Sequence, residues 1–237
     1  MPQQNQEAEK RQPTIQLDHY ESRFEKRKPN LFFVFHVGEV TEKLYFDGLC
    51  SDLLHSSITS EKKNKSQFVL LKFVNGTPEQ IVQSALEQVK VRQQKSAADT
   101  DEDIFWVVFD KDHGFSGKYS LAIALAQQEG ISVAYSNECF ELWLLLHWQE
   151  QTSSIGRRDL SDSLHEKWEA KVGRRIKKRK RKHFPYDIIR MDRQIAIERA
   201  KNLYELAKVK NPQSPWEVNP VTTVFELVEQ LIVFFTE

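Results

Sequence analysis

Two carboxylates, Asp110 and Asp112, stand directly after the apolar run 105–109. Such a run is typical of a strand buried on both faces of a parallel sheet, and ligands of open α/β sheets bind outside the carboxyl ends of the strands. Alternate residues of an extended chain point the same way, so the two carboxylates could share one cation. Oxygen ligands suit Mg²⁺. An acidic turn is the alternative, because aspartate is common in turns and His113-Gly114 follows.

Two further acidic candidates, Glu39 and Glu42, follow an earlier apolar run at 31–35 and the turn residue Gly38. Both fall in the turn or in the first turn of the helix expected over 42–54, with Thr41 as its cap. Acidic side chains are favoured at a helix N-terminus by the helix dipole. A purely structural role is therefore an open alternative to a role in catalysis or metal binding.

The segment 136–148 places Glu141 and His147 in an otherwise dense apolar sequence. Ser136 or Asn137 could cap a helix there. A carboxylate in such surroundings is costly unless it is paired or ligated. Glu141 therefore either faces the same sheet edge as the aspartates or hydrogen-bonds to a neighbouring loop. His147 is a candidate proton carrier, with a core histidine as the more common alternative.

A basic block near the middle of the second half carries eight Lys or Arg residues within ten positions. Its basic residues are Arg174, Arg175, Lys177, Lys178, Arg179, Lys180, Arg181 and Lys182. Such density favours an anionic partner, because the charges repel one another. Contacts to phosphates would hold a nucleic acid without reading its sequence. A solvated basic run is the alternative. A shorter basic stretch at 23–28 could also contact phosphates.

The order of expected elements indicates an α/β fold. Apolar runs predict strands at 31–35, 68–74, 104–109 and 131–135, separated by helices over 42–54, from Pro78 onward and over 119–128. Strands that alternate with helices predict a parallel sheet with right-handed crossovers. Beyond residue 149 we expect helices around Leu164 and Trp168, over 188–207 and over 222–235, with a loop at 209–220, and these helices should pack beside the sheet.

Composition limits the class of protein. The 237 residues carry no net charge, so only local clustering can indicate partners. The two cysteines make neither a disulfide framework nor a zinc pattern, which fits a reducing cytoplasm. We find no apolar signal segment and no run long enough to cross a bilayer. We expect a disordered tail over 1–22, an α/β core over 23–150 and a basic and helical C-terminal region over 151–237.

Four motifs together resemble the RloB family. They are Gly-Glu-x-Thr-Glu-x-x-Tyr-Phe at 38–46, Phe-Asp-x-Asp at 109–112, Ser-Asn-x-Cys-Phe-Glu-Leu-Trp at 136–143 with His147, and Asn219-Pro220 before the last helix. The resemblance implies a Toprim-like parallel sheet flanked by helices, with a C-terminal helical extension. It implies a site in which a glutamate after the first strand and an Asp-x-Asp pair hold Mg²⁺ or Mn²⁺. It also implies a role in prokaryotic phage defence, with a possible AAA- or ABC-type ATPase partner.

One position departs from the pattern that the resemblance implies. The usual Toprim glutamate directly precedes the turn glycine, and this chain has Val37 there. Either Glu39 or Glu42 supplies the missing ligand, or the metal site is weakened.

Two hypotheses follow. The first is a metal-dependent nuclease that cleaves DNA or RNA, with tRNA among the candidates. Its metal ligands would be Glu42, Asp110 and Asp112, and Glu39, Glu141 and His147 would be further catalytic candidates. The second is a non-catalytic module that binds nucleic acid or a partner. Chemistry on a small nucleotide is disfavoured, because the sequence has no glycine-rich phosphate loop.

Overall fold

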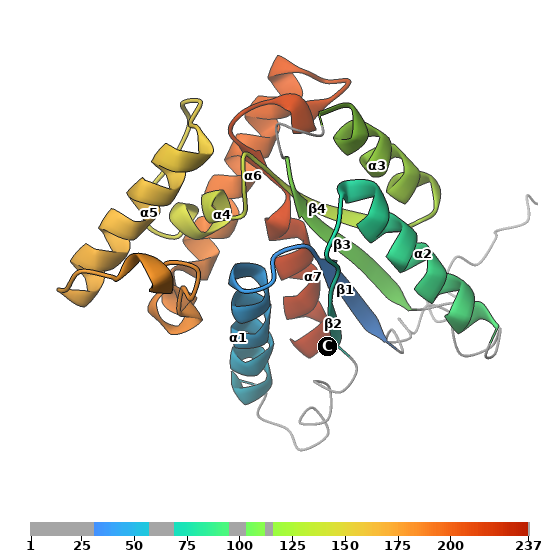
Figure 1. Ribbon diagram of the computed structural model, residues 1–237, viewed down its shortest axis with the longest axis horizontal. Helices are drawn as coiled ribbons and strands as arrows, with labels where there is room; N and C mark the ends of the chain where they lie inside the picture. Colours follow the sequence, from blue (N-terminus) through green and yellow to red (C-terminus); the bar gives the residue numbers. More distant parts are fainter. Residues whose placement is uncertain (1–30, 57–68, 95–102, 112–115, 237) are drawn as a thin grey trace, which may run out of the picture.

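The computed structural model describes residues 31–56, 69–94, 103–111 and 116–236. The tail expected over 1–22, the basic stretch at 23–28 and Asp112 lie outside these ranges. Strands and helices alternate through the first half of the chain (Figure 1). Their bounds are β1 Phe32–His36, α1 Thr41–Ser56, β2 Val69–Phe73, α2 Pro78–Gln93, β3 Ile104–Asp110, α3 Ser116–Gln128 and β4 Ser132–Asn137.

The second half is mainly helical. Its elements are α4 Glu141–Leu146, α5 Arg157–Val172, α6 Arg193–Lys210, the short strand β5 Val221–Thr222 and α7 Val224–Thr236. Single 3₁₀ turns lie at Lys178–Lys180, Tyr186–Ile188, Arg190–Asp192 and Pro215–Glu217. In the described part of the chain, no helix combines the length and apolar composition needed to cross a bilayer.

The five strands form one sheet in the order β2-β1-β3-β4-β5. The first four are parallel, and β5 pairs antiparallel with the end of β4 at Ser136 and Asn137. The expected parallel α/β sheet is therefore confirmed. The chain moves outward in one direction from β1 to β2 and in the other from β3 to β4. The strand order thus reverses between β1 and β3, and such switch points are where open α/β sheets bind ligands.

Alternate residues of the central strands serve two cores, which explains why their sequences are apolar throughout. On one face, Phe32 and Val34 of β1 join a cluster with residues of α1, α4, α5, α6 and α7. On the other face, Phe33 and Phe35 join a cluster with α2 and α3. Figure 1 shows α2 and α3 together on one side of the sheet, away from α1. On the face of α1, α7 packs against β4 and α6 against β5, whereas α5 packs against α4.

Local details differ from the sequence-based expectations. Ser136 and Asn137 do not cap a helix: β4 continues through them, and their side chains bond to Thr222 and to backbone carbonyls of the 216–218 turn. The α4 helix begins at Glu141 without a side-chain cap. Thr41 lies inside α1, and its hydroxyl donates to the Lys182 carbonyl instead of capping the helix.

Two C-terminal boundaries also differ. The helix expected over 188–207 is preceded by two 3₁₀ turns and begins only at Arg193. The helix expected from residue 222 begins at Val224, because Val221 and Thr222 form β5. A two-residue strand has no sequence periodicity to reveal it, and its pairing with β4 depends on contacts distant in the sequence.

Candidate functional site

The candidate site lies at the carboxyl ends of β1 and β3, beside the reversal of strand order. Asp110 is the last residue of β3, and Glu42 lies in the first turn of the helix that follows β1. Glu141 begins α4, shortly after the neighbouring strand β4 ends. Three acidic residues separated by up to a hundred positions therefore come from three loops at one edge of the sheet.

The Glu42 carboxylate reaches back from α1 over the turn after β1. Glu42 is only 5% exposed, and a Cβ placed on Gly38 would lie 1.4 Å from its Oε2 atom. Gly38 is thus needed because the carboxylate occupies the space that a side chain would fill. Glu39, three residues earlier in the same connection, is exposed to solvent. Of the two glutamates considered for this position, Glu42 is the one that enters the site.

The Asp110 carboxylate is largely enclosed, with 19% of its side chain exposed. It accepts a hydrogen bond from the backbone N–H of Phe140. Arg157, the first residue of α5, places Nη1 3.4 Å from Asp110 Oδ2 and donates from Nη2 to the Glu138 carbonyl at 3.0 Å. From the start of α5, Arg157 therefore connects the carboxyl end of β3 with the turn before α4.

The three carboxylates act on one another electrostatically. Burial raises the pKa of Glu42 to about 7, and the negative charge of Glu141 adds to the shift. Burial likewise raises the pKa of Asp110 well above its usual range, and the charges of Glu42 and Glu141 raise it further. The Arg157 guanidinium lowers both pKa values but does not cancel the shifts. The cluster is therefore short of positive charge.

Arg157 was not found by reasoning from the sequence. It stands 47 positions from Asp110 in a polar stretch, and no spacing connects it to the acidic motifs. Cys139 was also missed. Its buried thiol forms a hydrogen bond with Glu141, and burial together with the nearby carboxylates raises the pKa of that thiol. Cys139 is thus a neutral neighbour of the cluster rather than a thiolate ligand.

The donor chemistry fits a hard divalent cation only in part. Glu42 and Asp110, whose pKa values are raised, would gain from a cation, and oxygen donors are the ligands that Mg²⁺ prefers. Within residues 31–56, 69–94, 103–111 and 116–236, however, no three Asp, Glu, His or Cys side chains are already arranged as a ligand set. Mg²⁺ usually takes only one or two protein carboxylates together with water and substrate phosphates. The cluster is therefore compatible with a metal that binds together with substrate.

His147 lies at the other end of α4, in the core. It is 2% exposed, and its ring packs edge-on against Trp143 and Tyr45. Its Nδ1 bonds to the Trp143 carbonyl at 3.0 Å. Burial lowers the pKa of His147 to about 4. These surroundings favour the core-histidine alternative over the role of proton carrier.

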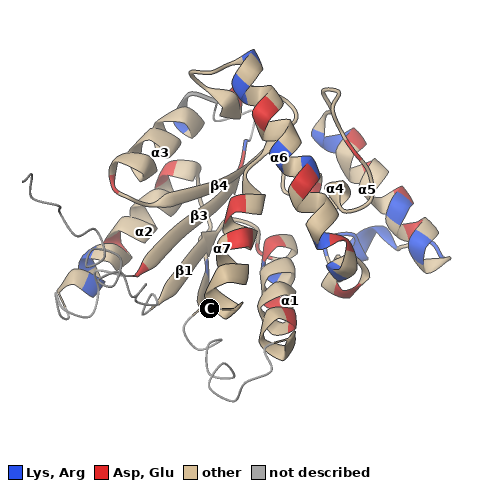
Figure 2. Ribbon diagram, turned by 180° about the vertical axis from the view of Figure 1, so that it is seen from behind, with Lys and Arg blue, Asp and Glu red and all other residues tan. Residues whose placement is uncertain are grey.

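The basic block leads from α5 back to the candidate site. Lys182 is the last basic residue of the block, and its carbonyl accepts a hydrogen bond from Oγ1 of Thr41, which precedes Glu42. The positive charge of Lys182 also lowers the pKa of Glu42. Figure 2 shows the blue ribbon of this block near α5 and α1. Except for Arg181, which pairs with Asp162, its basic residues are exposed. The aromatic residues after it, Phe184 and Tyr186, are buried in the core.

Comparison with known proteins identifies the family of this chain. No curated protein and no solved structure matches this chain significantly. The model of a protein family described as "RloB-like protein" matches residues 32–231, which include every element from β1 into α7. That range contains the acidic cluster, Arg157 and the basic block. On this match, the chain belongs to the RloB-like protein family.

Proposed function

We propose that this RloB-like protein is a divalent-metal-dependent nuclease that cleaves phosphodiester bonds in DNA or RNA, with tRNA among the candidate substrates. The observation that carries the proposal is the cluster of Glu42, Asp110 and Glu141 at the switch point of the sheet, with pKa values of Glu42 and Asp110 raised by burial and by like charge. Buried like charges are costly unless a cation compensates them. Perturbed carboxylates in such a position are typical of functional sites.

Glu42 and Asp110 are the residues that we expect to hold Mg²⁺ or Mn²⁺, with Asp112 as a further ligand outside the described ranges. A bound Mg²⁺ would supply Lewis acidity, which lowers the pKa of a bound water and stabilises charge on phosphate oxygens. In this proposal Glu141 would accept a hydrogen bond from a water bound to the metal. In this proposal Glu42 fulfils the role that a glutamate at position 37 would have, because its carboxylate lies beside the same turn.

Arg157 has a second role in the proposal. Its guanidinium compensates part of the negative charge while no metal is bound, through its contact with Asp110. With Asp110 among the residues that would hold a metal, the guanidinium could bind a phosphate oxygen instead, since its planar donors suit phosphate. The side chain is 47% exposed and so has room to turn. The basic block would hold the substrate backbone on the side of the site marked by Lys182.

The biological setting is also proposed. The chain belongs to the RloB-like family, and its resemblance to RloB proteins suggests phage defence in the prokaryotic cytoplasm, beside an AAA- or ABC-type ATPase partner. A nuclease of this kind would need its activity held back until infection. An incompletely assembled metal site, in which an arginine occupies one carboxylate, is compatible with such control.

A non-catalytic module remains the second candidate. The absence of a ready ligand set among the described residues favours it, and so does Val37 at the position of the usual glutamate. Such a module would bind nucleic acid through the basic block without cleaving it. Its binding would weaken steeply with salt, as counterion release requires. Replacing Lys178, Arg179 and Lys180 by Gln should reduce that salt dependence, whereas Lys90→Gln on α2 should not.

The test compares wild type with Asp110→Asn on DNA, tRNA and other RNA, with Mg²⁺, with Mn²⁺ and with a chelator. We expect metal-dependent cleavage by wild type, and a loss of about 1,000-fold in Asp110→Asn, since a metal supplies several kcal/mol of transition-state stabilisation. Glu87→Gln, an exposed change on α2, is the matched control. Unchanged cleavage by Asp110→Asn would contradict the proposed site. Tight nucleic-acid binding without cleavage under any condition would support the non-catalytic module.

A further inference from the structure

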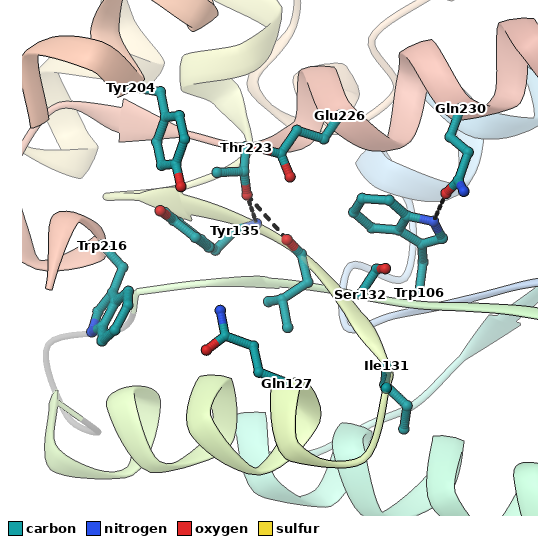
Figure 3. Close-up of a pocket in the computed structure, with 12 residues that line it drawn as sticks. Trp106, Gln127, Ile131, Ser132, Tyr135, Tyr204, Trp216, Thr223, Glu226 and Gln230 are labelled. Atoms are coloured by element: carbon teal, nitrogen blue, oxygen red, sulfur yellow. Dashed lines mark hydrogen bonds between the residues drawn. The ribbon is translucent and has the colours of Figure 1, made fainter. Parts of the chain in front are cut away.

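A cavity separate from the carboxylate site lies along the part of the β4 edge that β5 leaves open, between α3 on one side and α6 and α7 on the other (Figure 3). Its volume is about 650 Å³, within the range of small-molecule sites. β5 covers only Ser136 and Asn137 of β4, so the earlier residues of the strand are left to line the cavity. None of Glu42, Asp110, Glu141 and Arg157 contributes to it.

The lining combines aromatic rings with the carboxylate of Glu226. Trp106, Tyr135, Tyr204 and Trp216 come from β3, β4, α6 and the turn before β5, and Glu226 comes from the first turn of α7. Figure 3 shows the Glu226 carboxylate directed toward the space between Tyr135 and the Trp106 ring. Among the described residues that line the cavity there is no Lys or Arg. The cavity is therefore unsuited to phosphate and suited to a positive group.

The charge of Glu226 is compensated only in part. In the part of the chain that the structure describes, its carboxylate makes no ion pair, whereas its neighbours Glu229 and Glu205 pair with Lys201 and Lys208 at 2.6 Å each. Burial and the charge of Glu229 raise the pKa of Glu226, and Lys208 offsets this only in part. A cation inside the cavity would supply the missing charge.

The aromatic rings would add to that attraction. Cations are drawn to the faces of Trp and Tyr, and several rings around one carboxylate make a cage for alkylated ammonium groups. The indole N–H groups of both tryptophans already have acceptors. Trp106 Nε1 donates to Gln230, and Trp216 Nε1 donates to Ser120. These bonds hold the two indoles in place. The Tyr204 ring already attracts one ammonium group: Lys208, which does not line the cavity, places its Nζ 5.0 Å from the ring centroid.

We propose that this aromatic cavity binds an organic cation of the alkylammonium class through the Glu226 carboxylate and the rings of Trp106, Tyr135, Tyr204 and Trp216. The proposal does not depend on the nuclease reading of the carboxylate site. The cation could belong to a free small molecule or to a methylated lysine side chain of a partner protein. Both sources carry an alkylated ammonium group, and the experiment below distinguishes a small molecule from a partner protein.

The experiment is calorimetric titration of the full-length protein with choline and with 3,3-dimethyl-1-butanol, which has the same shape without the charge. We expect choline to bind about tenfold tighter than the neutral analogue, as a desolvated cation–π and charge contact requires. A short peptide with trimethyllysine is the second probe. Tighter binding of the peptide than of choline would assign the site to a partner protein, and the reverse order would assign it to a small molecule.

Two glutamates on the same helix give a matched pair of variants. Glu226→Gln keeps the shape of the cavity and should weaken choline binding about tenfold. Glu229→Gln, whose carboxylate pairs with Lys201, should bind choline as wild type does. Chemical shifts of the Trp106 and Trp216 indole N–H groups should move on titration in wild type, which places the ligand. Equal affinity for choline and its neutral analogue, no binding of either cation, or unchanged binding in Glu226→Gln would overturn the proposal.

Discussion

The two ends of the short helix α4 show how burial acts on an acid and on a base. At its start, Glu141 faces Glu42 and Asp110, whose pKa values are raised. At its end, the pKa of His147 is lowered to about 4. In both places burial favours the neutral form, because a low-dielectric interior penalises charge. Only the acidic end groups several like charges that a cation could compensate, and this is why we place the chemistry there.

The same difference predicts opposite effects of pH on stability. Glu42 titrates near 4.5 when unfolded and near 7 when folded. Between these values the folded state holds a proton that the unfolded state has lost, so stability falls as pH rises. His147 titrates near 6.5 when unfolded and near 4 when folded. Between those values the unfolded state holds the extra proton, so stability rises with pH. The contributions of Glu42 and His147 to the pH dependence of stability therefore have opposite signs over nearly the same pH range.

Glu42→Gln should give the largest change. It removes the loss of stability between about pH 4.5 and pH 7, which amounts to about 3 kcal/mol for a shift of this size. Urea unfolding at a series of pH values without metal should therefore show that the variant becomes more stable than wild type as pH rises. Added Mg²⁺ should stabilise wild type and not the variant.

Glu39→Gln is the matched control for Glu42→Gln, because Glu39 is exposed in the same connection. We expect it to follow wild type in both unfolding and metal response. If Glu39→Gln instead abolished the response to Mg²⁺, Glu39 and not Glu42 would be the glutamate of the site.

His147→Phe should expose the opposite slope. The variant keeps an aromatic ring against Tyr45 and Trp143 and loses the titrating group. Compared with wild type, it should lose about 2 kcal/mol less stability on going from about pH 7 to about pH 4.5. Metal-dependent activity, measured near neutral pH, should persist. A complete loss of activity in a folded His147→Phe protein would restore His147 as a proton carrier.

Gly38→Ala tests the close approach of Glu42 to the turn. The added methyl group would collide with the Glu42 carboxylate, which can turn away because it is the end of a flexible side chain. We expect Mg²⁺ affinity to fall about tenfold, or about 1.4 kcal/mol, with little change in fold by circular dichroism. The double variant Gly38→Ala/Glu42→Gln should bind Mg²⁺ no more weakly than Glu42→Gln alone, since both changes remove one interaction. Additive losses would show that Gly38 acts in another way.

Arg157→Gln should give the smallest effect of the series. The guanidinium lowers the pKa values of Glu42 and Asp110, so without it both carboxylates lose their protons at higher pH. The acidic limb of the pH dependence of Mg²⁺ binding should therefore move upward by roughly half a unit to one unit. Arg158→Gln, an exposed neighbour on α5, should leave that limb in place. A downward shift in Arg157→Gln would contradict the compensating role of Arg157.

The sequence by itself determined the strand and helix order, because long apolar runs and helical periodicity are local signals. It also identified Glu42 and Asp110 as candidates, because they follow the ends of expected strands, and Glu141, because a charge within an apolar segment is costly unless it is paired or ligated. It could not choose between Glu39 and Glu42. That choice depends on how the turn at Gly38 directs α1, which is a property of backbone geometry.

Only the tertiary structure decided which distant residues meet. Arg157 joins the acidic cluster because α5 begins beside the ends of β3 and β4, and the basic block approaches Glu42 because Lys182 bonds to Thr41. The aromatic cavity likewise draws on β3, β4, α6 and α7. Local sequence patterns report on neighbours along a strand or helix, whereas these contacts follow from how separate elements pack on two faces of one sheet.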